Sequence, residues 1–125
     1  MNREEIFKRE LGYINDERIR KACLEMLKLL PDYFFEIPAS STGKYHPAYA
    51  LGEGGLLRHT KAATLFGYIL LKNPAIGDKY TAKEKDMMIM SLMLHDGLKS
   101  GMPKEKYTRF DHPLLICDLI MDNEE

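Results

Sequence analysis

The chain has 125 residues, with 18 basic and 19 acidic side chains and a formal net charge of -1 at pH 7. Hydrophobic residues make up 45% of the sequence and charged residues 30%, which is typical of a globular domain and excludes a disordered chain. The balanced charge gives no indication of a nucleic-acid or anionic-membrane partner. We expect one domain over residues 1–125.

The cysteines and the N-terminus indicate the compartment. Cys23 and Cys117 stand far apart, each within an apolar helical pattern, so we expect both to be reduced core residues rather than a disulfide. The first ten residues, MNREEIFKRE, are charged from the start and do not form a signal peptide. Because the longest apolar run is too short to span a bilayer, we predict a soluble, cytoplasmic protein with no membrane partner.

The N-terminal quarter predicts two helices. The first covers residues 3–12, with Asn2 as its cap and two glutamates near its positive end. The second opens at Asp16 and ends at Pro31. Its apolar residues follow the helical i, i+3, i+4, i+7 spacing: Ile19, Ala22, Cys23, Met26, Leu27 and Leu30.

Residues 31–53 form a long predicted loop, with one turn around Asp32–Phe35. We expect this loop to pack against the protein because it is rich in aromatic side chains, namely Tyr33, Phe34, Phe35, Tyr45 and Tyr49. A third helix is predicted from Gly54 to Lys72, and the pair Asn73-Pro74 stops it.

A capping box formed by Thr81 and Glu84 predicts the start of a fourth helix, which ends near His95–Gly97. A loop follows over residues 97–110, and Asp111 caps a last helix. The prediction is an all-α bundle of five to six helices. We assign to its core the large apolar residues of the third and fourth helices, including Phe66, Ile69, Leu70, Met87, Met88, Met90 and Met93.

The four histidines, His46, His59, His95 and His112, lie in loops or near predicted helix ends. Imidazole nitrogen and carboxylate oxygen are ligands that suit Zn, Mn, Fe, Co or Ni. His95 and Asp96 are adjacent, so on a regular helix they point about 100° apart. Both can reach one metal ion, or two neighbouring ions, if the helix unwinds at Gly97.

These segments resemble the HD superfamily of metal-dependent phosphohydrolases. The stretch GGLLRHT, which contains His59, is similar to the family's first histidine segment, and MMIMSLMLHDGLKSG is similar to its apolar helix ending in HDIGK. His95 and Asp96 occupy the His-Asp doublet, Lys99 falls where the family lysine does, and His112 in DHPLLICDLI resembles the next family histidine. The resemblance covers roughly residues 46–120 and implies an HD-like helical fold.

The resemblance also implies hydrolysis of a phosphoester at a mono- or dinuclear centre of divalent metal, such as Mn, Fe, Zn, Ni, Co or Mg. His59 and His95 then hold the metal, Asp96 ligates it and bridges a second ion, His112 binds that second ion, and Lys99 orients the phosphate. The implied substrate is a phosphorylated small molecule, a nucleotide or a nucleic-acid end. The sequence does not indicate an oligomeric state.

The chain departs from the family pattern in two ways. The glycine of HDIGK is displaced to Gly97, and the family's later metal-binding aspartate has no clear counterpart, since Asp118 and Asp122 both come early. That aspartate either lies beyond Glu125 or is missing. The alternative function is therefore a catalytically incomplete HD-type module that binds metal or nucleotide and regulates. A second alternative is a helical interaction domain with incidental histidines.

Each candidate residue also has a structural interpretation. The His95-Asp96 pair alone is consistent with an ordinary helix C-terminus. His112 is either a ligand or part of an Asp-His-Pro turn, and Lys99 either contacts phosphate or is an exposed loop lysine. His46 either reaches the site from the long loop or belongs to a surface turn.

Overall fold

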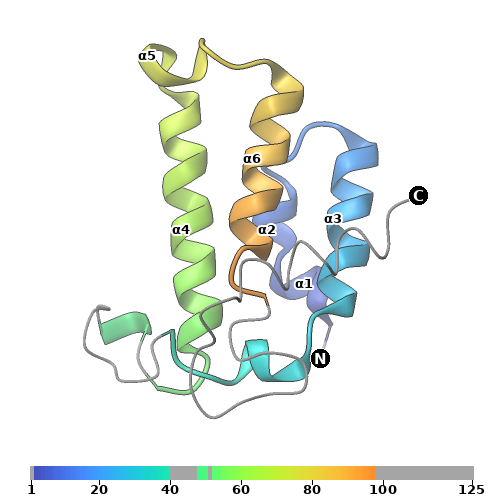
Figure 1. The fold of residues 1–125 in the computed structure, drawn as a ribbon, viewed down its shortest axis with the longest axis vertical. Helices are drawn as coiled ribbons and strands as arrows, with labels where there is room; N and C mark the ends of the chain where they lie inside the picture. Colours follow the sequence, from blue (N-terminus) through green and yellow to red (C-terminus); the bar gives the residue numbers. More distant parts are fainter. Residues whose placement is uncertain (1, 40–47, 51, 98–125) are drawn as a thin grey trace. The chain divides into compact units, whose positions relative to one another are not determined.

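The computed structural model describes residues 2–39, 48–50 and 52–97, and this part of the chain is all-α (Figure 1). It contains six α-helices and two short 3-10 helices, with no strand among these residues. The predicted all-α class and the predicted number of helices are therefore confirmed. The last predicted helix, from Asp111, lies outside the described residues.

The contacts within the chain define two compact units. The first comprises Met1–Leu29 and Lys61–Leu94, and the second comprises Leu30–Thr60 and His95–Glu125. Helix α4 (Gly55–Lys72) begins in the second unit and continues in the first. The single domain over residues 1–125 stays a prediction.

The first predicted helix is interrupted in the structure. Helices α1 (Arg3–Ile6) and α2 (Lys8–Leu11) are separated at Phe7, whose backbone leaves the helical region at φ -101° and ψ 17°. The Phe7 side chain is fully buried there, so core packing overrides the local helical preference. The predicted cap is confirmed, because the Asn2 side chain accepts a hydrogen bond from the Glu5 amide.

At the start of helix α3 (Glu17–Leu29), backbone amides donate hydrogen bonds to two aspartates. Asp16 Oδ1 accepts from the Arg18 amide at 2.8 Å, as the sequence predicts. Asp86, which is buried, accepts from the amides of Asn15 and Asp16 at 3.0 and 2.9 Å through its two oxygens. The carboxylate of one helix thereby fixes the start of another.

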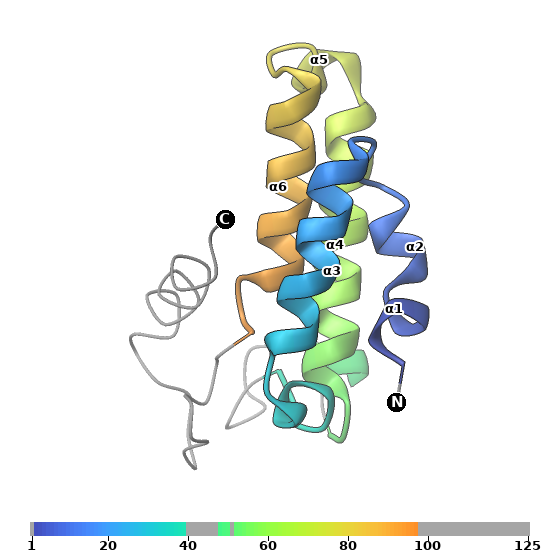
Figure 2. The same cartoon turned by 90° about the vertical axis from the view of Figure 1, so that its right-hand side faces the viewer.

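Helix α6 (Ala82–Leu94) lies beside α3 in the first unit, and it carries Asp86 (Figures 1 and 2). The predicted capping box is confirmed: the Thr81 amide donates to Glu84 and the Glu84 amide donates to the Thr81 hydroxyl. Cys23 of α3 is buried against Met93 of α6, with their sulfur atoms 3.7 Å apart. The core positions predicted for these two residues are confirmed.

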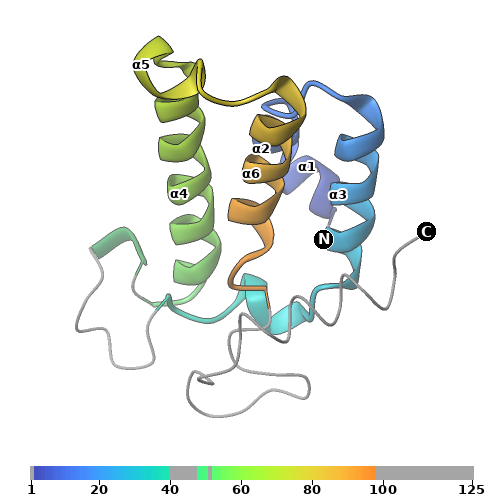
Figure 3. The same cartoon turned by 45° about the horizontal axis from the view of Figure 1, so that its top comes forward.

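A short helix, α5 (Pro74–Gly77), joins α4 to α6 (Figure 3). The sequence interpretation treated Asn73-Pro74 only as a stop. The same pair also starts α5, because the Asn73 side chain accepts from the Ala75 amide and proline is tolerated in a first helical turn. Where α4 approaches α6, a Cβ at Gly67 would meet the tip of the Leu92 side chain, which would have to shift to make room for it.

A partly buried ion pair joins α4 to the N-terminal helices. The Lys61 ammonium donates to Glu10 Oε1 at 2.7 Å and to the Ile6 carbonyl at 2.5 Å, and it lies over the Phe7 ring. Glu10 is only 2% exposed. This carboxylate is therefore compensated by an opposite charge within the first unit.

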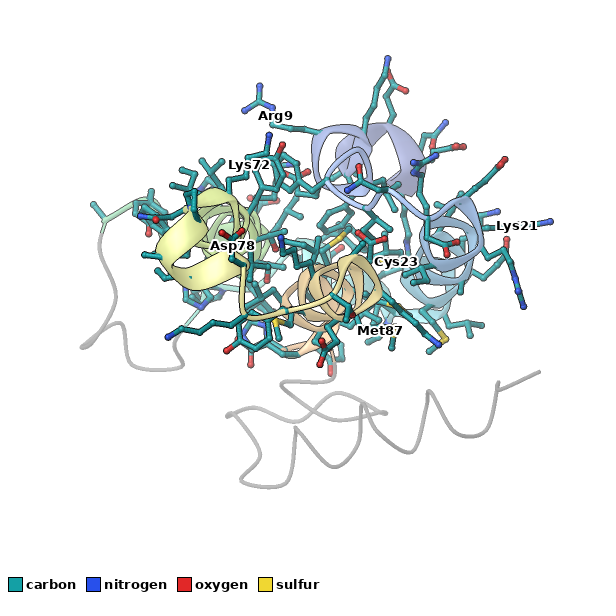
Figure 4. All side chains as sticks on the ribbon, turned by 90° about the horizontal axis from the view of Figure 1, so that it is seen from above. Arg9, Lys21, Cys23, Lys72, Asp78 and Met87 are labelled. Atoms are coloured by element: carbon teal, nitrogen blue, oxygen red, sulfur yellow. The ribbon has the colours of Figure 1, made fainter. Side chains whose placement is uncertain are left out.

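The core assignment for four apolar residues is wrong. Phe66, Ile69 and Leu70 on α4 are 61%, 54% and 53% exposed, and Met87 on α6 is 45% exposed. Figure 4 shows Met87 on the outer side of α6, whereas Cys23 lies among the helices. Leu65, next to Phe66, is exposed as well.

These residues lie on the sides of their helices that no described part of the chain covers. Apolar residues occur on several sides of both helices, so the sequence pattern does not reveal which face is covered. None of the described helices combines the length and the apolar content needed to cross a membrane.

Candidate metal centre

The long loop before α4 packs onto the start of that helix, within the second unit. Its 3-10 helix η1 (Asp32–Phe35) confirms the predicted turn, and Tyr33, Phe34 and Phe35 are all buried. Tyr49, in η2 (Ala48–Ala50), is 45% exposed, so the packing predicted for this ring is wrong. Tyr45 lies outside the described residues.

The loop supplies carbonyl groups to the first amides of α4. The Gly54 amide donates to Glu36, the Gly55 amide to Gly52 and the Leu56 amide to Ile37, at 2.9, 3.0 and 2.9 Å. These amides have no partner within their own helix, so the loop satisfies them and fixes where α4 begins. Because carbonyls already occupy these donors, the helix start is not an open anion site.

The glycine pair of the GGLLRHT stretch has a structural explanation. Gly54 has φ +72°, a left-handed conformation that most residues avoid. A Cβ on Gly55 would collide with the backbone of Ala50, which accepts a hydrogen bond from the Ala39 amide. The two glycines thus let the loop lie directly against the helix that carries His59.

His59 lies one turn into α4, as predicted, and is partly exposed. His95 and Asp96 follow directly after Leu94, the last residue of α6, and belong to a turn that continues to Gly97. The predicted unwinding at this position is confirmed. Because residues 95–97 are not helical, the two adjacent side chains are released from the divergence of about 100° that a helix imposes.

The three side chains come together in the second unit. The Asp96 Oδ2 atom lies 3.1 Å from His95 Nε2 and 3.9 Å from His59 Nε2. One ligand atom from each of the three residues lies within 4.8 Å of the other two. The imidazole ring centroids are 6.4 Å apart, with their planes inclined at 58°.

The burial of the three side chains differs in a way that suits a metal centre. The Asp96 side chain is 10% exposed, while the His59 and His95 side chains are 25% and 42% exposed. The carboxylate is thus almost enclosed and the imidazoles face partly outward. A site of this kind retains access for water or a substrate.

The donor set and its spacing fit a divalent transition metal. Ligand atoms that bind one ion at about 2.0–2.2 Å lie roughly 3 to 3.5 Å apart in tetrahedral or octahedral coordination. The separation between Asp96 and His95, 3.1 Å, falls within that range, and the separation between Asp96 and His59, 3.9 Å, is slightly longer. Binding of all three atoms to one ion requires the His59 side chain to move closer to the other two.

Other predicted site residues fall where the structure gives no description. His46, Lys99, Asp111, His112, Asp118 and Asp122 lie outside the described residues. Their predicted roles stay predictions. Among residues 2–39, 48–50 and 52–97, no second group of three histidine, cysteine or acidic side chains has metal-binding spacing.

Arg58 is a basic residue near the site that the sequence interpretation overlooked. It is exposed, directly precedes His59, and donates from Nε to the Tyr49 carbonyl at 2.5 Å. Its guanidinium adds positive charge near the start of α4, which favours an anionic ligand. In the sequence, Arg58 could have been found from its position directly before the candidate ligand His59.

Comparison with known proteins identifies no relative of this chain. No protein-family model, no curated protein and no solved structure matches the chain.

Proposed function

We propose that this chain is an HD-type metal-dependent phosphohydrolase that holds its metal with His59, His95 and Asp96. The observation that carries the proposal is the convergence of two imidazoles and an enclosed carboxylate within 4.8 Å. The three residues come from segments far apart in the sequence, and their order matches the family pattern. Several agreeing features at one site weigh more than a single short motif.

The chain's own residues have distinct tasks in this proposal. Asp96 supplies the negative charge that offsets a cation, and its burial keeps that charge from being screened by water. His59 and His95 supply neutral nitrogen ligands from two different segments, so a metal binds only when both segments are folded. A divalent metal held there lowers the pKa of a coordinated water toward neutrality and neutralises charge on phosphate oxygens.

The substrate in this proposal is a phosphoester, in a nucleotide, at a nucleic-acid end or in a phosphorylated small molecule. The exposed side of His95 leaves room for the phosphate, and Arg58 near the start of α4 adds positive charge. Lys99 and His112, at the positions that the family resemblance assigns to phosphate and second-ion binding, complete the proposed site.

Metal binding is tested first, by elemental analysis and by titration of Mn, Zn, Fe, Co and Ni into metal-free protein. We expect stoichiometric binding to the native chain and a loss of at least tenfold in affinity for His95→Ala and for Asp96→Asn. Asp78→Asn is the matched control, because Asp78 is an exposed carboxylate at the end of α5. Equal metal affinity in all four proteins would contradict the proposed centre.

Metal should also stabilise the fold. A ligand that binds only the native state at a hundred times its dissociation constant adds about 2.7 kcal/mol to the free energy of unfolding. Thermal unfolding with and without a chelator should therefore differ for the native chain and for Asp78→Asn, but not for Asp96→Asn. An unchanged midpoint in the native chain would argue against a bound metal.

Hydrolysis is tested with a generic phosphodiester, a phosphomonoester and a panel of nucleotides. Turnover that depends on metal and disappears in Asp96→Asn supports the enzyme. Metal binding without turnover favours the alternative, an HD-type module that binds metal or nucleotide and regulates. No clear counterpart of the family's late aspartate occurs among residues 1–125, and this observation supports the alternative.

A further inference from the structure

Two tyrosine rings form a face-to-face stack within the first unit. Tyr13 lies in the turn after α2 and Tyr68 lies on α4, and both belong to the first unit. Their ring centroids are 4.0 Å apart, and the ring planes are inclined to each other by only 6°. Both residues are half-buried, so small molecules in solution can reach the pair.

The backbone on both sides of the stack is fixed by hydrogen bonds. The Tyr13 amide donates to the Glu10 carbonyl at 3.0 Å, and the next residue, Ile14, is fully buried. The guanidinium of Arg20 donates to the Ile14 carbonyl through Nε and one terminal nitrogen, at 3.1 and 2.8 Å. Tyr68 lies in the interior of α4, where the helical backbone holds it. Two ordered segments therefore hold the ring contact.

The stack is closer than aromatic pairs usually are. Such pairs prefer offset or edge-to-face arrangements with centroids about 4.5–7 Å apart, because the negative faces of two rings repel each other. The ammonium of Lys72, one helical turn after Tyr68, lies over the Tyr68 ring at 5.1 Å from its centroid. A cation in this position attracts the negative ring face and lowers the repulsion between the rings. Two phenol rings are thus held at contact distance.

Phenol rings stacked at this distance are suited to oxidative coupling. A phenol that loses one electron and its proton becomes a neutral radical, whose unpaired electron is shared between the oxygen and the ring carbons beside the hydroxyl-bearing carbon. Two such radicals form a bond through these carbons. The separation of 4.0 Å is close to an ordinary carbon contact of about 3.5–4.0 Å, so little movement is needed before the bond forms.

We propose that Tyr13 and Tyr68 are a site of oxidative modification, at which a peroxide-dependent one-electron oxidant joins the two rings by a carbon–carbon bond. Each phenol gives up one electron and one proton, and the two radicals couple through ring carbons beside the hydroxyl-bearing carbons. The hydrogen on each joined carbon then moves to the oxygen as a proton, which restores both phenols. Hydrogen peroxide accepts the two electrons and two protons and becomes two molecules of water.

The cross-link ties the turn after α2 covalently to α4. Because these segments are far apart in the sequence, the link closes a long loop and restricts the unfolded chain more than the folded chain. The oxidised protein should therefore unfold at a higher temperature than the untreated protein.

The reaction is tested on the native chain with a peroxidase and hydrogen peroxide, at a protein concentration low enough to limit coupling between molecules. Peptide mass spectrometry should find residues 13 and 68 of one chain joined with the loss of two hydrogen atoms. Tyr68→Phe keeps the ring but removes the phenol, so most of the dityrosine fluorescence should be lost. Tyr80→Phe is the matched control, since Tyr80 is 38% exposed outside the pair, and it should retain the native fluorescence.

A second variant separates the stacked geometry from mere proximity in the chain. Tyr68→Phe combined with Ile69→Tyr keeps all seven tyrosines but places the phenol on an exposed side of α4, where Ile69 is 54% exposed. Thermal unfolding before oxidation checks that each variant is folded. We expect little coupling between position 69 and Tyr13. Coupling there as efficient as in the native chain would overturn the proposal. It would also be overturned if the native chain gave no link between residues 13 and 68 while free tyrosine coupled in the same mixture.

Discussion

Cys23 shows how far its surroundings can change the chemistry of a single residue. It is fully buried between α3 and α6, and this burial raises the pKa of its thiol from 9.0 to about 12. Away from water the uncharged thiol is favoured over the thiolate. A thiol in this state is a poor nucleophile at neutral pH, so Cys23 acts as an apolar core residue.

We predict that Cys23 in the folded protein does not react with a thiol reagent at pH 8. In the Cys117→Ser variant, which removes the other cysteine, the labelled fraction should be near zero under native conditions and complete in denaturant. Rapid labelling of the folded variant would contradict the burial of this thiol.

The raised pKa also predicts a dependence of stability on pH. Below pH 9 the thiol is protonated in both the folded and the unfolded chain. Above pH 9 the unfolded chain loses this proton while the folded chain keeps it, up to a pKa of about 12. The free energy of unfolding should therefore fall between pH 9 and pH 10.5 by more in the native chain than in Cys23→Ala, as urea denaturation at each pH would show.

The sequence predicted which residues form the candidate site, but it did not predict the distances between their side chains. The order His59, then His95-Asp96, suggested a shared centre, and convergence of the last two was expected if the helix unwinds near Gly97. Helix α6 ends at Leu94, before both residues, and Asp96 as a whole residue is 7% exposed. The sequence alone did not predict this burial.

At the scale of the helices, local signals were reliable where they involve hydrogen bonds between near neighbours. The Asn2 cap, the Asp16 cap and the Thr81–Glu84 capping box all lie where the sequence predicts them. The break at Phe7 was not predicted, because a buried ring in the tertiary core decides it. Asp86 was missed for the same reason, since its partners lie about seventy residues earlier in the chain.

The carboxylate of Asp86, which connects α6 to the start of α3, leads to a prediction about the free energy of unfolding. In Asp86→Asn, one side-chain oxygen becomes an NH₂ group that faces a backbone N–H donor, and the buried cap is lost. We expect the free energy of unfolding to fall by about 1–3 kcal/mol. Asp78→Asn, at an exposed carboxylate, should change it by less than about 0.5 kcal/mol. Similar urea midpoints in the two variants would show that Asp86 does not stabilise the helix start.

Gly55 gives a prediction for the start of α4. In Gly55→Ala the added methyl group would meet the carbonyl of Ala50, so the loop must move away from the helix that carries His59. We expect a loss of about 1–3 kcal/mol in the free energy of unfolding, together with weaker metal binding. In Gly12→Ala the nearest atom to the new methyl is 3.1 Å away, a milder contact. Equal effects of the two substitutions would contradict the role assigned to Gly55.

On the scale of the molecule, an ion pair between Glu10 and Lys61 stabilises the first unit, and no local pattern in the sequence predicts it. Glu10 and Lys61 lie 51 positions apart, and Glu10 is nearly inaccessible to water. Their attraction offsets the cost of burying charge only while both are present. The pair Lys28 and Glu25 on α3 has exposed side chains and serves as the natural comparison.

We predict that Lys61→Met lowers the free energy of unfolding by about 3 kcal/mol, because it leaves the Glu10 carboxylate buried without its cation. The double variant Lys61→Met with Glu10→Leu should recover most of this loss. Lys28→Met, at the exposed pair, should cost less than about 0.5 kcal/mol. Denaturant titration of the four proteins would refute the prediction if the double variant were no more stable than Lys61→Met.

The sequence by itself determined the helical class, the positions of most helices and the residues that can bind metal, because these depend on periodicity, on caps and on residue type. Only the tertiary structure decided which face of each helix is covered and which charges are paired. Residues 62–71 of α4 carry no charge on any side, so the sequence of this part of the helix does not distinguish the side near Leu92 from the exposed side at Phe66. Contacts between residues distant in the chain are set by packing, which no local pattern encodes.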